Sequence, residues 1–139
     1  MQGMKKIFLF SVLVLFTSLI FAQKKHRIVF DFTKNDTASF SSIMRQAKNI
    51  LIETGNAELE IVCHGPGLDM IMTGKTTVSK EVEELHNKYN VIFAACAATM
   101  KRRGIDKSQL FPFTIVVPLA NLEFSSRQQE GWSYIKAGY

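Results

Sequence analysis

Cys96 is the residue of this sequence whose type and position most clearly indicate chemistry. It follows an apolar run, Val91 to Ala95, that predicts a buried strand, and it precedes residues that predict a helix ending near Arg103. A thiol at such a junction lies close to unpaired backbone N–H groups, which favour the thiolate form. The position therefore indicates a nucleophile with a lowered pKa. The other interpretation is a small buried side chain that fills a tight turn, since free cysteines are commonly buried.

A second cysteine and a histidine follow another predicted strand, which runs from Leu59 to Cys63. If the two strands are neighbours, Cys63 and Cys96 lie at the same edge of the sheet. They can form a disulfide only when their Cα atoms come within about 7 Å. His64 is a candidate proton partner for either thiol. The other interpretation makes Cys63 a core residue and His64 a solvated turn residue.

The loop after His64 reads Gly65-Pro66-Gly67, a turn signal that ends the strand. Because its backbone carries few side chains, a substrate or a partner chain can approach this edge closely, and we take it as a candidate substrate loop. The sequence contains neither a phosphate loop nor a dinucleotide fingerprint, and its three histidines and two cysteines lack metal-ligand spacing. We therefore expect no cofactor and no metal site.

Predicted strands and helices alternate along the rest of the chain. Besides the two strands already described, strands are predicted at residues 26–32, 113–117 and 132–135. Helices are predicted at residues 37–54, about 78–89, 97–103 and 121–130, with short turns at 68–72 and 106–109. This alternation predicts an α/β fold, a three-layer open parallel sheet of about five strands, with reactive groups at the carboxyl ends of the strands.

Residues 1–22 have the three-part pattern of a secretory signal peptide. A basic pair precedes an apolar run over residues 7–21, which is shorter than the ~20 residues of a spanning helix, and Ala22 suits a cleavage site. We expect one domain over residues 23–139, no membrane span after cleavage, and a periplasmic or secreted location. The alternative is an uncleaved N-terminal anchor, because Ile20 is larger than a cleavage site prefers.

The charge of the chain is modest and dispersed. The net charge is +5, or +3 without Lys5 and Lys6, and the remaining basic residues are scattered along the sequence. This distribution predicts no nucleic-acid-binding surface. Apolar residues beyond the needs of one small core, such as Phe111, Phe113 and Phe124, favour self-association.

Four segments of the sequence resemble the DsrE-like family, and they occur in the same order. They read VCHGPGL from Val62, VIFAACAATM from Val91, Val117-Pro118, and QEGWSYIK from Gln129. The resemblance spans nearly all of the chain after residue 22. It implies a small α/β protein of the flavodoxin-like type that assembles into trimers or hexamers.

The resemblance also implies a role for the cysteine after the apolar strand. In the members of this family that relay sulfur, that cysteine accepts and passes on a persulfide sulfur, and it matches Cys96 here. The basic pair and the glycine that often follow match Arg102, Arg103 and Gly104.

Three features depart from the family pattern. Ala98 stands where members often carry Asn, so a hydrogen-bond donor near the thiolate is missing, and Cys63 adds a second thiol. The signal peptide distinguishes the chain from cytoplasmic relay proteins. We expect a persulfide carrier or sulfurtransferase-like protein whose partners are sulfur donor and acceptor proteins or small sulfane-sulfur compounds. The alternatives are a non-catalytic oligomeric binding module and a thiol–disulfide element that uses Cys63 and Cys96.

Overall fold

Five parallel strands form one sheet in the computed structural model, which describes residues 1, 3 and 25–138. Their order across the sheet is β4-β3-β2-β1-β5, so β4 and β5 are the two edge strands. The strands are β1 (Arg27–Phe32), β2 (Glu58–Cys63), β3 (Ile92–Cys96), β4 (Ile115–Val117) and β5 (Ser133–Lys136). All four pairings are parallel, which confirms the predicted α/β fold.

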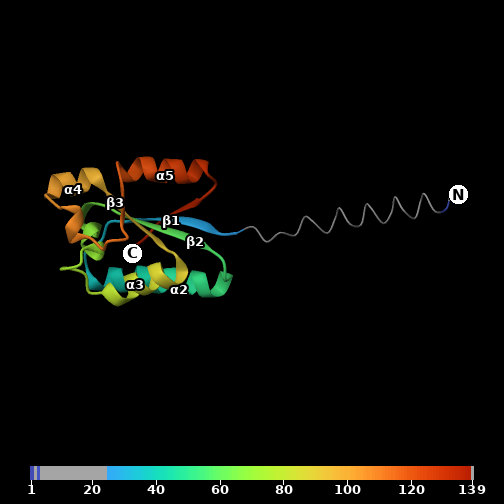
Figure 1. Cartoon of the computed structure of the whole chain (residues 1–139), viewed down its shortest axis with the longest axis horizontal. Helices are drawn as coiled ribbons and strands as arrows, with labels where there is room; N and C mark the ends of the chain where they lie inside the picture. The colour runs from blue at the N-terminus through green and yellow to red at the C-terminus, as the bar shows by residue number, and fades with distance from the viewer. Residues whose placement is uncertain (2, 4–24, 139) are drawn as a thin grey trace.

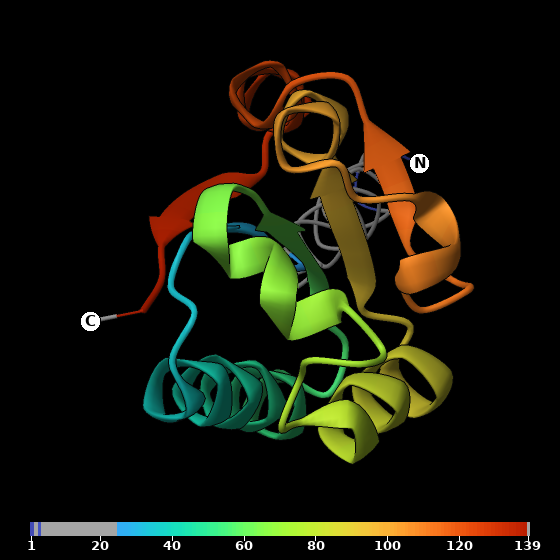
Figure 2. The ribbon, with the colours of Figure 1, turned by 90° about the vertical axis from the view of Figure 1, so that its left-hand side faces the viewer.

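Helices cover both faces of the sheet and make the outer two of three layers. Helices α2 (Thr37–Thr54) and α3 (Ser79–Tyr89) lie on one face, and α4 (Ala97–Arg103) and α5 (Ala120–Gln129) lie on the other (Figure 1). Figure 2 shows the same layers from the side, with α4 and α5 next to each other at the top. Two short 3₁₀ segments, η2 (Gly65–Ile71) and η3 (Lys107–Gln109), complete the fold.

Local sequence signals account for most element boundaries. Asp36 caps α2 by accepting a hydrogen bond from the Ser39 N–H at 2.9 Å, and Gly55 ends the helix with a φ of 69°. Asp106 and Gln109 form the predicted capping box on η3. These side chains are short-range signals, which is why the residue pattern alone could place these helix ends.

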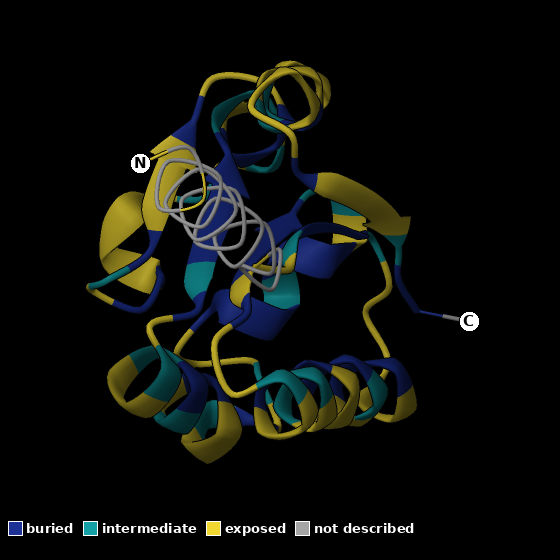
Figure 3. Cartoon of the chain, turned by 90° about the vertical axis from the view of Figure 1, so that its right-hand side faces the viewer, coloured by how far each residue is buried: buried dark blue, intermediate teal, exposed yellow. Residues whose placement is uncertain are grey.

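The sheet separates two cores of unequal size. Successive residues of a strand point to opposite faces, so Phe30 packs toward α2 and α3 whereas Val29 packs toward α4 and α5. The larger core lies under α2 and α3. The smaller core under α4 and α5 consists of Val29, Val62, Ala94, Cys96, Val117, Ala120, Phe124 and Trp132. Figure 3 shows the buried central strands between helices whose outer surfaces are exposed, with the edge strands β4 and β5 largely exposed.

The aromatic residues near β4 pack inside the molecule, which corrects one expectation. Phe111 and Phe124 are buried, and Phe113 stacks on His86 with ring centroids 4.0 Å apart. These residues fill the cores of one chain and give no support to self-association. A turn, in which the Thr114 N–H donates to the Phe111 carbonyl, also delays β4 to residue 115 instead of the predicted 113.

The predicted signal peptide lies outside the described residues except for residues 1 and 3. Within the described part of the chain, no helix is both long and apolar enough to cross a membrane. The structure thus describes the predicted domain from residue 25 onward.

Candidate functional site

Two helix starts meet at the sulfur of Cys96. The residue ends β3, and α4 begins at the next position, as the sequence predicts. The second start comes from a distant segment, because Ala120 is the first residue of α5. Burial opposes ionisation of the thiol, but the N–H groups of Thr99, Ala120 and Ala98, together with the Thr99 hydroxyl, outweigh it, so the pKa of Cys96 is lowered.

The attraction between these groups and the sulfur is electrostatic. Within the described chain, the Cys96 side chain makes no capping hydrogen bond to the first turn of α4. Helix α4 spans seven residues, so the local N–H groups of its first turn matter more than a long-range dipole. The site therefore lowers the pKa of the thiol without holding the sulfur in one hydrogen-bonded geometry.

Cys96 is nevertheless covered. Only 5% of the residue is exposed, and it belongs to the small core under α4 and α5. Little of the residue is therefore open to solvent in this conformation. The start of α5 accounts for part of the cover. The segment that leads into this helix is held next to α4, because the Pro118 carbonyl accepts a hydrogen bond from the Ala98 N–H at 3.3 Å.

Thr99 supplies the polar side chain that Ala98 lacks. Its hydroxyl is buried beside Cys96 and accepts a hydrogen bond from the Gly65 N–H at 3.2 Å. The same hydroxyl therefore connects the sulfur to the loop after β2. Sequence reasoning missed this residue, although the third position of a helix is where a side chain can reach back to the residue that precedes the helix.

Cys63 is not part of this site. It pairs with Ala95 in the sheet and packs in the larger core under α2 and α3, whereas Cys96 faces α4 and α5. Burial raises the pKa of the Cys63 thiol. Because the two side chains point to opposite faces, a disulfide between them requires a backbone movement, and both cysteines are free. The structure therefore gives no support to Cys63 as a helper of Cys96.

His64 does lie beside Cys96. Cys63 pairs with Ala95 of β3. The residues that come directly after this pair, His64 and Cys96, are therefore also neighbours. The imidazole faces the same side as Cys96, where its ring meets Phe124 of α5 at a centroid distance of 6.0 Å. The ring Nε2 lies 2.7 Å from Asp31 Oδ1.

Asp31 holds the imidazole in place and was missed by sequence reasoning. Besides His64, its carboxylate accepts hydrogen bonds from the Tyr134 hydroxyl at 2.6 Å and from Lys136 Nζ at 3.0 Å. Burial alone raises the pKa of Asp31, but these three donors outweigh burial and lower it to about 2. Since an ionised carboxylate only accepts hydrogen bonds, His64 donates from Nε2, and in the neutral ring Nδ1 is then the acceptor nitrogen.

The two glycines of the Gly65-Pro66-Gly67 loop are required for different reasons, a left-handed backbone at Gly65 and a close contact at Gly67. Gly65 has a φ of 55°, and a Cβ on Gly67 would lie 2.5 Å from the Phe32 carbonyl oxygen. The close approach that Gly67 permits is thus made by β1 of the same chain. The loop is fixed further by Arg103, which donates to the Gly65 carbonyl at 2.9 Å.

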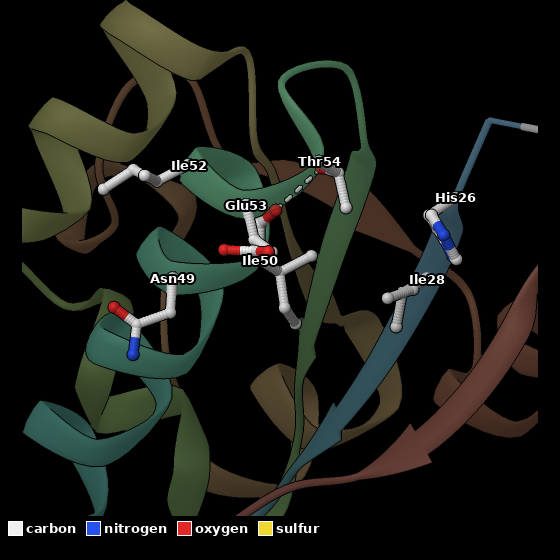
Figure 4. A pocket seen from close by; sticks show the side chains of 7 residues that line it. All are labelled: His26, Ile28, Asn49, Ile50, Ile52, Glu53 and Thr54. Atoms are coloured by element: carbon white, nitrogen blue, oxygen red, sulfur yellow. Dashed lines mark hydrogen bonds between the residues drawn. The ribbon is translucent and has the colours of Figure 1, made fainter. Parts of the chain in front are cut away.

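A groove of about 600 Å³ lies elsewhere on the molecule, beside the first residues of β1. His26 and Ile28 face Ile50 and Thr54 of α2 across it (Figure 4). It is at the amino end of the strand, whereas Cys96, His64 and Asp31 gather at the carboxyl ends. No three His, Cys, Asp or Glu side chains of the described residues are placed to hold a metal ion together.

Comparison with known proteins identifies the family of the chain. The model of the DsrE/DsrF-like family matches residues 11–137. The chain belongs to the DsrE/DsrF-like family. Among curated proteins, none matches the sequence. The family membership confirms the resemblance drawn from the four sequence segments and connects the chain with sulfur relay in general terms.

Solved structures support the same fold. A protein of unknown function, MTH1491 from Methanobacterium thermoautotrophicum, is similar with a TM-score of 0.76 and 26% identity, over 81% of this chain and 99% of that one. A conserved protein of unknown function, BT1422 from Bacteroides thetaiotaomicron, has a TM-score of 0.64 and 15% identity, over 79% of this chain and 93% of that one. The second likeness concerns the fold alone.

Proposed function

We propose that this DsrE/DsrF-like protein is an exported persulfide carrier or sulfurtransferase-like protein that uses the single thiol of Cys96. The observation that carries the proposal is the convergence of two helix starts and the Thr99 hydroxyl on one sulfur, which lowers its pKa. A thiolate is the form that attacks sulfane sulfur, so this environment suits sulfur transfer. Family membership supports the same role.

The transfer consists of two exchanges that leave the overall oxidation state unchanged. The Cys96 thiolate attacks the terminal sulfur of a donor persulfide, a new S–S bond forms, and the donor leaves as a thiolate. In the second exchange an acceptor thiolate attacks the outer sulfur of the Cys96 persulfide. That attack returns Cys96 to its thiolate form and leaves the persulfide on the acceptor.

His64 is suited to handle the proton of the incoming thiol. Its Nε2 is engaged by Asp31 at 2.7 Å, which leaves Nδ1 as a base. We assign His64 as the proton acceptor for an acceptor thiol and Asp31 as the residue that positions it. The pKa of Cys96 itself is lowered by its N–H neighbours and the Thr99 hydroxyl.

Mass spectrometry of the purified protein after treatment with a sulfane donor tests this function. We expect a gain of one sulfur atom on Cys96, which is lost on reduction and absent from Cys96→Ser. Cys63→Ser serves as the matched control and should react like the wild type, because Cys63 is buried on the other face. If the wild type gains no sulfur while a known carrier does, the proposal fails.

A non-catalytic binding module is the second candidate, and the 5% exposure of Cys96 favours it. In that case Cys96 only packs the turn. The Cys96→Ala variant would then keep both the fold and the cellular phenotype, and thiol reagents would not label the native protein. The same labelling measurement therefore separates the two candidates.

We further propose that the chain is exported and cleaved after Ala22. The support is the signal pattern of residues 1–22. Intact-mass measurement of protein recovered from the periplasm or medium of expressing bacteria should give a chain that begins at Gln23. A full-length mass in the membrane fraction would instead indicate the uncleaved anchor.

We also propose that the protein forms a homo-oligomer through the open edge of β4 and the start of α5. Four large apolar side chains are exposed there: Ile115, Val116, Leu119 and Leu122. The stretch from Ile115 to Leu122 carries no charged side chain, although the chain has a net charge of +5. A neutral surface minimises repulsion between two positively charged copies, which favours a second copy as the occupant.

A further inference from the structure

A buried carboxyl group in the middle of the sheet has no part in the chemistry of Cys96. Glu60 lies on β2 between Val29 and Ile92, its neighbours on β1 and β3, and is 0% exposed. Its Oε2 accepts a hydrogen bond from Arg127 Nε of α5 at 2.5 Å. Its Oε1 has no hydrogen-bond partner within the described chain. A carboxylate buried in this way is costly to keep ionised.

Two carboxylates compete for the same N–H of Arg127. The Nε atom that donates to Glu60 lies 3.0 Å from Glu123 Oε1, and Nη1 lies 3.2 Å from Glu130 Oε2. Two like charges at one donor favour uptake of a proton by the more buried carboxyl group. Burial is the largest cause that raises the pKa of Glu60, Glu123 raises it further and Arg127 lowers it, with a result of about 7.

The other groups around this cluster come from β1 and the end of α5. The Arg127 guanidinium lies 4.7 Å from the centre of the Trp132 ring. The guanidinium of Arg27 on β1 lies 6.0 Å from the centre of the same ring. Arg27 also donates to the Glu130 carbonyl at 2.8 Å. The neighbours of Glu60 on β1 and β3, Val29 and Ile92, are apolar and do not titrate. The cluster therefore joins the end of α5 to the sheet.

Helix α5 buries few side chains of its own, so its polar contacts with the sheet matter for its position. Only Ala120 and Phe124 are buried on α5, whereas α2 buries six residues. The start of α5 provides the Ala120 N–H to Cys96, and Phe124 lies against His64. Detachment of α5 from the sheet would therefore remove part of the cover of Cys96, which is 5% exposed when the helix is in place.

We propose that Glu60, Glu123 and Arg127 form a pH-sensitive latch that holds α5 over Cys96 and loosens as the pH rises toward neutrality. The biological meaning of this latch rests on the proposed sulfur transfer, because it controls access to the same thiol. Its physical operation is independent of that function, because α5 opening can be measured directly.

The direction of the pH effect on α5 closure follows from proton linkage. With α5 open, Glu60 is solvated and titrates near its ordinary pKa of 4.5, whereas with α5 closed the pKa is about 7. The closed state binds the extra proton, so closure is most favourable below the open-state pKa and weakens up to the closed-state pKa. Since each pKa unit is a tenfold effect, the equilibrium for opening rises about a hundredfold between these pH values.

Hydrogen exchange of the α5 amides, corrected for intrinsic exchange, measures this opening in the full mature chain. Protection of α5 should fall about a hundredfold from pH 5 to pH 8, while protection of α2 serves as an internal reference. The Glu60→Gln variant carries a neutral side chain of the same shape, so its α5 protection should stay constant. Glu84→Gln, which removes an exposed ion pair with Lys48 on the other face, should behave like the wild type.

A second variant keeps the proposal testable if Glu60→Gln does not fold. Glu123→Gln removes the competing carboxylate, so Glu60 keeps Arg127 to itself and the transition should move to lower pH. The fluorescence of Trp132, the one tryptophan of the chain, reports the same transition because Arg127 lies over its ring.

The outcomes separate this proposal from the proposed function. Constant α5 protection in the wild type, or an unchanged fall in Glu60→Gln, overturns the latch even if Cys96 accepts sulfur. Failure of Cys96 to accept sulfur at every pH, together with the expected fall in α5 protection, overturns the sulfur-transfer role and leaves the latch in place.

Discussion

At the scale of single residues, the Thr99 hydroxyl serves three partners at once. It favours the Cys96 thiolate, and it accepts hydrogen bonds from the Gly65 N–H at 3.2 Å and from Arg102 Nη2 at 3.5 Å. The thiol environment therefore depends on a loop that follows a different strand. A substitution at Thr99 should change both the ionisation of the sulfur and the stability of the fold.

Thr99→Val should raise the pKa of Cys96 and slow its alkylation at neutral pH, because the thiolate loses a donor. The variant also leaves the Gly65 N–H unpaired, which should cost about 1–3 kcal/mol in the free energy of unfolding. The pH dependence of iodoacetamide labelling and a urea titration measure the two effects.

Thr114→Val is the matched control for that experiment. Thr114 is also buried, but its hydroxyl has no hydrogen-bond partner within the described chain. Its replacement should leave the labelling profile unchanged and alter stability by less than about 0.5 kcal/mol, or increase it. Equal effects from both threonines would contradict the role assigned to Thr99.

Asp31→Asn should remove an acid-sensitive part of the stability. The folded pKa of Asp31 is about 2 and its ordinary value is 3.8, so its ionised form stabilises the fold above the ordinary value. This contribution, about 2 kcal/mol, is lost as the pH falls from 4 toward 2. Urea titrations at several pH values should therefore show a flatter acid limb for the variant than for the wild type.

The residue pattern could identify Cys96 and His64 because each directly follows an apolar strand. It could not identify Asp31 or Ala120 as neighbours of the site, since sequence spacing says nothing about which distant strands become adjacent. It also did not reveal that Cys63 faces the opposite side, which follows from the two-residue alternation along β2 and β3.

At the scale of elements, the strand-to-helix junctions position the chemistry. The predicted boundaries of α2 and α4 agree with the structure because caps and glycines near in sequence define them. The path of α5 across the sheet could not be predicted in the same way. It follows from the placement of β4 and β5 at opposite edges, and that order depends on long-range packing.

Gly67→Ala should destabilise the junction between β1 and η2. An added Cβ would lie 2.5 Å from the Phe32 carbonyl oxygen, and a backbone atom cannot move aside cheaply. We expect a loss of about 1–3 kcal/mol in urea unfolding. Gly74→Ala is the control, because open space surrounds that position, and its effect should stay within about 0.5 kcal/mol.

At the scale of the whole molecule, four of the exposed apolar side chains lie together at the β4 edge of the sheet, and others lie on α2 and on β5. The phenylalanines that favoured self-association from the sequence are in the cores, whereas Leu119 and Leu122 are exposed on α5. Composition could not make this distinction, because burial depends on which face of each element meets the sheet.

Leu122→Lys should convert the proposed oligomer into monomers, because it places a charge on the neutral surface. Leu122 is 57% exposed, so the fold of one chain should tolerate the change. Ile52→Lys is the matched control on α2, where Ile52 is 63% exposed on the opposite layer. Light scattering after size-exclusion chromatography measures both. A wild-type monomer, or equal dissociation by both variants, would contradict this interface.

The pairing of β5 with β1 has a consequence for folding during synthesis of the protein. Asp31 obtains Tyr134 and Lys136 as partners only when the last strand of the chain has been synthesised. Until then one side of β1 presents unpaired backbone groups, which invite pairing with other chains. A ribosome that stops before residue 133 should therefore release a chain prone to aggregate, and a chaperone that shields β1 would protect it.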